Sequence, residues 1–326
     1  MKKLLKISAV TLAVGVILSL VGVFIARRDN VNPGSIYAIV ESNLKISESI
    51  VELEAPKAAE LSSVTRNSLK NATYGLNEFN TLELYAENAD VRFAGTDNET
   101  IRVSLDNGSL TTAIKEGTLY IQAVCEESSD GHLTVEIPEI YKGACVINAA
   151  ASALDLGSIE SAMDMIFSLD ASSLEAGELK ADNITVMLNA STIGADSMIA
   201  SDSLKLFACA SELKTQSLSS KYTALEADNS TVTLPSLSCG FSCECRMSTL
   251  ELSFTEVTGN ISLDTTAGSA VVKLPKDAPI ELRHSEEYGI LTNKTNHAQN
   301  DAANSSFHYT METNIKFGIV TLEELR

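Results

Sequence analysis

A serine recurs at intervals of 18 to 20 residues through the middle of the chain. An apolar residue follows two positions after each serine, as Ile193 follows Ser191 and Leu213 follows Ser211. A period near 20 residues with fixed apolar positions is typical of stacked structural repeats, each of which buries its apolar face against its neighbours. The series predicts a seventh corner at Ser269 and a structural corner ladder at Ser152, Ser172, Ser191, Ser211, Ser230 and Ser248.

The residues that precede each serine have a two-residue rhythm. Apolar side chains stand seven, five and three positions before it, as Ile184, Val186 and Leu188 do before Ser191. This alternation is typical of a β-strand with one buried face. Its phase changes at the serine, where we expect the strand to bend. The residues predicted for the core are Leu154, Leu174, Val186, Ile193, Leu206, Leu213, Val232, Cys243, Cys245 and Leu250.

The repeat length and the two-residue alternation together favour one class of repeat fold. Leucine-rich repeats have a similar period, but their LxxLxLxxN/C motif is absent from this chain. A helical array is disfavoured because no 3.6-residue rhythm replaces the short two-residue one. We therefore predict an all-β fold, a β-solenoid of the parallel β-helix or prism type, with coils of about 20 residues that stack at about 4.8 Å.

The first 28 residues differ from the rest of the chain. Three lysines precede an uncharged run over residues 7–26, and Arg27 and Arg28 follow it. A helix that crosses a bilayer needs about 20 residues, so we expect an uncleaved signal anchor, a single transmembrane helix, over residues 1–28. A cleaved signal peptide is the alternative, although Phe24 interrupts the usual small-x-small pattern.

The remaining chain divides into two predicted parts. Residues 29–77 mix charged with scattered apolar residues, and we interpret them as a juxtamembrane stalk or linker before a solenoid domain over residues 78–326. The first 28 residues hold five of the 24 basic residues and none of the 43 acidic ones, which leaves a net charge of −24 for the rest. Such a surface repels nucleic acid. We expect the N-terminus in the cytoplasm and the acidic domain outside the cell membrane.

Residues 82–123 read LELYAENADVRFAGTDNETIRVSLDNGSLTTAIKEGTLYIQA, and LTVEIPEI follows at residues 133–140. This succession resembles the opening of the bacterial putative-adhesin domain family, a β-solenoid domain of unknown function in membrane-anchored Gram-positive envelope proteins. Residues 267–289 and 314–324 resemble its closing strands. The resemblance covers residues 78–325. It implies an extracytoplasmic protein, sometimes encoded with envelope-stress signalling systems, and supplies no catalytic residues.

Three of the six cysteines, Cys239, Cys243 and Cys245, lie close together in the sequence. The last two take the inward positions that Val186 and Leu188 fill in another coil, which favours burial as small apolar side chains. A disulfide and a zinc site remain alternatives, although no second CxxC motif or histidine pair completes a ligand set. The remaining candidate is Cys209, which falls at an outward position and is expected to be an exposed free thiol.

Catalytic motifs are absent from the sequence. There is no GxSxG, HExxH, phosphate-binding glycine loop or EF-hand pattern. Asp170, Asn189 and Asp228 form an outward series, but the glycine–aspartate signature of calcium-binding β-rolls is missing, which favours a solvated turn face over a calcium site. We therefore expect no catalytic residue, cofactor or metal.

The leading hypothesis is a non-enzymatic, membrane-anchored extracytoplasmic solenoid. It would act as an adhesin or scaffold that presents an acidic surface to an unknown envelope protein or wall polymer. An accessory or sensory component of cell-envelope stress signalling is the alternative. An enzyme acting on wall glycans would need two carboxylates that converge across adjacent coils, and no spacing in the sequence demands this.

Overall fold

The computed structural model describes residues 70–126, 131–295 and 309–325, and the regular elements assigned there are β-strands. The all-β prediction is confirmed. The anchor predicted for residues 1–28 lies outside the described residues. Within the part of the chain that the structure describes, no helix is long and apolar enough to cross a membrane.

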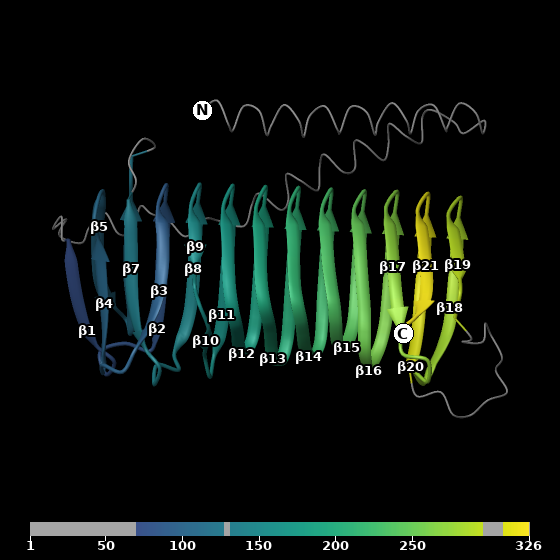
Figure 1. The fold of residues 1–326 in the computed structure, drawn as a ribbon, viewed down its shortest axis with the longest axis horizontal. Coiled ribbons are helices and arrows are strands. Elements are labelled where there is room, and N and C mark those ends of the chain that lie inside the picture. The colour runs from purple at the N-terminus through teal and green to yellow at the C-terminus, as the bar shows by residue number, and fades with distance from the viewer. Residues whose placement is uncertain (1–69, 127–130, 296–308, 326) are drawn as a thin grey trace. The chain divides into compact units, whose positions relative to one another are not determined.

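The central coils stand side by side as parallel strands (Figure 1). Within the straight segments, each residue pairs with the residue one repeat later, so that Ser173 pairs with Thr192 and Thr192 with Glu212. This register is that of a β-solenoid, as the repeat predicts. The strands of this part are β8 (Ala144–Ala150), β9 (Ala153–Asp155), β10 (Ile159–Glu160), β11 (Asp164–Asp170), β12 (Ser173–Asn189), β13 (Thr192–Cys209), β14 (Glu212–Asp228), β15 (Thr231–Arg246), β16 (Thr249–Thr266) and β17 (Ser269–Leu274).

Each coil has three straight segments, because the inward phase breaks twice within every long strand. In β13 the buried positions run 193 and 195, then 198 and 200, then 204, 206 and 208. We name the segments that lead into the serine face A, those that follow it face B, and the third segments face C. In β12 these are residues 183–189, 173–176 and 178–181. Further face A segments of the central coils are residues 145–150, 164–170, 203–209, 222–228, 240–246 and 261–266.

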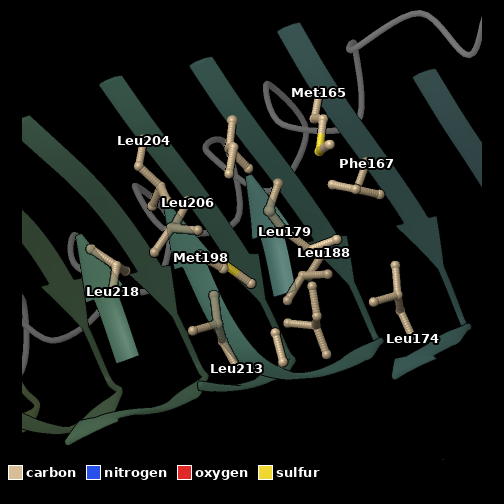
Figure 2. Packing of buried hydrophobic residues seen from close by; sticks show 14 of the residues in the cluster. Met165, Phe167, Leu174, Leu179, Leu188, Met198, Leu204, Leu206, Leu213 and Leu218 are labelled. Atoms are coloured by element: carbon tan, nitrogen blue, oxygen red, sulfur yellow. The ribbon is translucent and has the colours of Figure 1, made fainter. Parts of the chain in front are cut away.

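The interior is a narrow stack of aliphatic side chains. Figure 2 shows Leu204, Leu206 and Leu213 directed into one continuous cluster with side chains of neighbouring coils. None of the ten residues predicted for the core exposes more than 3% of its surface. Their burial across successive coils, at about 25 cal/mol per Å² of apolar surface, supplies the main driving force for stacking.

The residue before each corner serine has a left-handed backbone. Its φ lies between 47° and 50° at Ala151, Ala171, Ala190, Ala210, Asn229 and Met247. This conformation costs a residue with a side chain about 1–2 kcal/mol, and only glycine adopts it freely. The sequence predicts a bend at the serine, and the structure places the unusual backbone angle one residue earlier.

Each corner serine links two coils through its hydroxyl group. The Oγ of Ser191 accepts the N–H of Ser172 at 3.1 Å and donates to the carbonyl of Asn189 at 2.7 Å. The same two contacts recur at all six corner serines, with acceptor distances of 3.0–3.1 Å and donor distances of 2.6–2.8 Å. All six side chains are buried. The hydroxyl therefore satisfies a backbone N–H that would otherwise be buried without a partner.

The N-terminal end of the described solenoid mixes parallel and antiparallel strands. β2 and β3 extend faces A and B by parallel pairing with β8 and β9. Beyond them β4 pairs antiparallel with both β7 and β1, and β5 pairs antiparallel with β6. β1 lies within the segment expected to be a linker. The strands are β1 (Asn71–Gly75), β2 (Thr81–Glu87), β3 (Asp90–Thr96), β4 (Thr100–Leu105), β5 (Ser109–Lys115), β6 (Thr118–Val124) and β7 (His132–Pro138).

The C-terminal coils do not follow the order of the chain. β20 (Tyr309–Lys316) and β21 (Ile319–Glu324) lie between β16–β17 on one side and β18 (Ile280–Glu287) and β19 (Ile290–Asn293) on the other (Figure 1). All four pairings are parallel. The last strands of the sequence therefore form the penultimate coil.

The seventh corner corrects the prediction by one residue. Ser269 pairs with Thr249 rather than Ser248, and Gly268 takes the corner place after Ala267, whose φ is 53°. A Cβ atom at residue 268 would lie 2.7 Å from the carbonyl oxygen of Ser248, so the site requires glycine. Aligning the repeats on serine fails at a corner that has no serine.

Candidate functional site

The outward side chains of face A form straight rows across the coils. One row, which we name row 1, contains Asp170, Asn189, Cys209, Asp228 and Arg246 at successive registers. The outward positions predicted from the sequence for Asp170, Asn189, Cys209 and Asp228 therefore fall side by side, about 4.8 Å apart. The amide nitrogen Nδ2 of Asn189 donates to Oδ1 of Asp170 at 2.9 Å.

Asp228 is the least exposed member of row 1, with only 7% of its surface accessible. Its Oδ1 atom accepts a hydrogen bond from Nδ2 of Asn229 at 3.0 Å. Burial raises the pKa of the carboxyl group, and the charge of Arg246 opposes this shift. Burial also raises the pKa of the neighbouring Cys209 thiol, and the charge of Asp228 adds to that effect. In row 1, therefore, the carboxyl group of Asp228 is buried beside the charge of Arg246.

The adjacent row of face A is more acidic than row 1. Row 2 contains Met187, Phe207, Glu226, Glu244 and Asp264 at successive registers. Its three carboxylates occupy three coils in succession and repel one another, because like charges that stand opposite each other in a sheet are unfavourable.

Two contacts offset part of the repulsion along row 2. Arg246 lies 3.2 Å from Oε2 of Glu244. At the far side of the row, Nδ2 of Asn314 donates to Oδ1 of Asp264 at 2.6 Å. Row 2 therefore combines an apolar half, at Met187 and Phe207, with an acidic half that has few compensating cations.

Face B and face C carry both ion pairs and exposed carboxylates such as Glu175. Glu160 on face C contacts both Lys142 and Lys180, and these two cations lower the pKa of its carboxyl group to about 2. Lys273 contacts Glu251 at 2.8 Å beside face B. Exposed pairs of this kind add little stability, about 0–1 kcal/mol each. They neutralise the charges only at these positions.

The cysteine cluster lies in the interior. The side chains of Cys239, Cys243 and Cys245 expose 0–1% of their surface, and all three thiols are free. Burial raises the pKa of Cys239 and of Cys245 to about 11 and places that of Cys243 well above the ordinary thiol range. Thiolate is the form that reacts and binds metal. These cysteines therefore act as small core side chains.

The hydroxyl groups of the corner serines are also unavailable for catalysis. Each hydroxyl both donates and accepts a backbone hydrogen bond, so it is not available to a substrate. Among the described residues, no group of three His, Cys, Asp or Glu side chains is arranged to hold a metal ion. His132 lies 3.5 Å from Asp90 on the surface, and His297 and His308 fall outside the described residues.

One exposed aromatic pair has no counterpart among the sequence predictions. The rings of Tyr288 and Phe317 stack with centroids 5.2 Å apart and an angle of 10° between their planes. Both residues occupy the left-handed corner position, with φ of 57° and 55°, and a glycine follows each of them. Alignment on a corner dipeptide that ends in glycine, as Ala267-Gly268 does, would have found both.

The chain is similar to one known protein family and, more distantly, to several solved structures. A model of the Toastrack DUF4097 family matches residues 79–316. A putative adhesin from Bacteroides fragilis NCTC 9343 is 10% identical with a TM-score of 0.43, over 78% of this chain and 96% of that chain. A putative lipid binding protein from Parabacteroides distasonis ATCC 8503 is 9% identical with a TM-score of 0.37, over 78% and 96%.

Neither likeness is close enough to carry an argument about function. No curated protein matches the chain. The family match spans more than half of the chain, and it confirms the resemblance to the putative-adhesin domain family that the sequence motifs indicate. The protein with this serine-cornered solenoid therefore belongs to the Toastrack DUF4097 family.

Proposed function

We propose that the protein is a non-enzymatic binding protein of the cell envelope. In this proposal an N-terminal anchor holds the chain to the membrane, and face A presents row 2 outside the cytoplasm to an envelope protein or wall polymer. The observation that carries the proposal is the contrast between inward and outward positions. Inward residues of face A are mostly apolar in every coil, whereas row 2 changes from Met187 and Phe207 to three carboxylates.

The chemistry of row 2 limits the kind of partner. Three carboxylates at a spacing of about 4.8 Å favour a partner with several positive charges, because a cationic group relieves their mutual repulsion. Phe207 and Met187 continue the same row and offer apolar contact beside the charges. The net charge of −24 beyond Arg28 supports the same preference at long range.

Partner capture from native envelopes tests the proposal. The tagged full-length chain is crosslinked in native membranes, and its co-sedimentation with isolated cell wall is measured in parallel. We expect the variant E226Q/E244Q/D264N to capture at least about tenfold less partner than the wild type. Capture by the wild type should weaken as added salt screens the charges.

A matched variant removes three exposed carboxylates elsewhere on the solenoid. E175Q/E178Q/D196N makes the same change in net charge on face B, face C and the turn between them. We expect this variant to capture the partner as the wild type does. Equal capture by both triple variants, or no specific partner for the wild type in either arm, contradicts the proposal.

A further inference from the structure

The coil formed by β18 and β19 ends the described solenoid with an open strand edge (Figure 1). β18 pairs with β20 along one edge, and no strand among the described residues pairs with its other edge. The N–H and C=O groups on such an edge are a template for a further strand. The open stretch of β18 is residues 283–287, whose side chains are all exposed, whereas Ile280 and Leu282 are buried.

An apolar ridge flanks this edge. Tyr288 and Ile290 in the last coil and Ile319 in the penultimate coil expose 75%, 56% and 50% of their surfaces. Phe317 stacks on Tyr288, Ile290 is in register with Ile319, and the two pairs flank the corner glycines Gly289 and Gly318. None of the large hydrophobic residues that the described structure exposes lies in β1 to β6, at the opposite end. Concentrated exposed apolar surface of this kind marks an interaction site.

The charges on β18 identify the occupant of the edge. In a twofold pairing of two copies the strands run antiparallel, and the inner side of one sheet must continue into the inner side of the other. One residue therefore lies on the twofold axis and faces its own copy. With Ser285 on the axis, Arg283 stands opposite Glu287 of the second copy, and His284 stands opposite Glu286.

The other registers along the open stretch are unfavourable. An axis at Arg283, Glu286 or Glu287 sets a charged residue against itself. An axis at His284 sets Glu281 against Glu287. Like charges directly opposite each other are destabilising in a sheet, and unlike charges are favourable. The register centred on Ser285 is therefore the one that sets Arg283 opposite Glu287 on both sides of the axis and places no two like charges opposite each other.

We infer that a second copy of this chain occupies the open edge of β18 in a twofold, end-to-end dimer centred on Ser285. Tyr288 directly follows the paired stretch, so the second copy covers part of the ridge. Ser285 also lies in row 2, next to Asn314 and Asp264, and its Oγ is 2.6 Å from Oδ1 of Asn314. The dimer joins row 2 of both copies into one continuous row across the axis.

Crosslinking through the twofold axis tests the dimer in native membranes. A cysteine at residue 285 faces its own copy, within reach of a short bismaleimide. We expect Ser285→Cys in the full-length chain to give a crosslinked dimer at least about tenfold more abundant than the control Ser219→Cys, which places a cysteine on exposed face C. Equal dimer yields from the two variants overturn the inference.

Charge reversal in trans separates pairing from folding. In the Ser285→Cys background, Arg283→Glu alone places two glutamates opposite each other on both sides of the axis, and Glu287→Arg alone places two arginines there, so each variant should lose the dimer. When the two variants are coexpressed, a mixed dimer in this register has unlike charges at residues 283 and 287 on both sides of the axis. Coexpression should therefore restore the crosslink relative to either variant alone. Lys221→Glu makes the same change in charge as Arg283→Glu at an exposed mid-solenoid site and should have no effect. No rescue on coexpression contradicts the register.

Discussion

At the scale of the residue, the corner dipeptide explains how a 20-residue coil closes without a glycine. The first residue accepts a left-handed backbone, and the second supplies a hydroxyl that joins two coils. Alanine and serine are both small, so successive corners stack closely. Where Gly268 replaces serine, the backbone approaches the neighbouring corner too closely for a Cβ atom. The serine is thus a structural residue, and its recurrence is not evidence of a nucleophile.

Removing one corner hydroxyl should measure its contribution to stability. Ser191→Ala leaves the buried N–H of Ser172 without its acceptor. We expect the free energy of unfolding to fall by about 1–3 kcal/mol, the usual penalty for a buried unsatisfied donor. Chemical denaturation checks this value. Ser219→Ala, at an exposed position on face C, should change the free energy of unfolding by less than about 0.5 kcal/mol.

A substitution that relieves the strained left-handed backbone should raise the free energy of unfolding rather than lower it. Ala190 has φ of 47° and its side chain is exposed, so glycine loses no buried contact there. We expect Ala190→Gly to raise the free energy of unfolding by about 0.5–1 kcal/mol, after the greater flexibility of glycine in the unfolded chain is included. Ala195→Gly, at a buried strand position, should destabilise the protein. A loss of stability in Ala190→Gly would show that the corner is not strained.

At the scale of the element, the coil is the unit that the sequence predicts best. Inward positions such as Val186 and Leu206 repeat at a fixed spacing, so local pattern alone assigns them to the core. The antiparallel pairing of β1 with β4 could not be predicted in this way, because it joins segments with no repeat relation. The placement of β20–β21 between β17 and β19 could not be predicted from the sequence pattern either, because the order of pairing depends on contacts between residues distant in sequence.

Deleting one whole coil should preserve the fold. Thr192 pairs with Glu212 and Ser191 stands at the same corner as Ser211, so removal of residues 192–211 joins equivalent points of the stack. We expect this variant to keep its β-type circular dichroism and a cooperative melt, at a lower temperature. Removal of residues 192–201 alone shifts every later segment to another face and should abolish the melt. Similar behaviour of the two deletions would refute the coil as the structural unit.

At the scale of the whole molecule, the stack divides the chain into a regular interior pattern and a variable surface. The interior repeats the same chemistry at each level, so each coil is stabilised by the coils on either side of it. The residues in the outward rows of face A differ from coil to coil. The sequence pattern predicts that they point outward, but it does not predict how far each one is buried. The sequence predicts that Asp228 faces solvent with Asp170, yet Asp228 is buried between Cys209 and Arg246. Burial in such a row depends on neighbours from other coils.

A charge in the interior should unfold the entire stack. Val186 is fully buried between Phe167 and Leu206 of adjacent coils. Val186→Asp places a carboxylate there without a partner, and we expect a loss of about 4 kcal/mol or more. Thermal unfolding followed by circular dichroism checks the effect. Thr185→Asp, one residue away at an outward position, should melt close to the wild type.

Surface labelling of intact cells measures whether the solenoid lies outside the cytoplasmic membrane, as we propose. Lys214 and Lys221 are exposed on the described solenoid, so a membrane-impermeant amine reagent can reach them in the folded protein. We expect both lysines to be labelled on intact cells while cytoplasmic proteins remain unlabelled. Labelling of Lys214 and Lys221 only after the membrane is permeabilised would contradict the proposal.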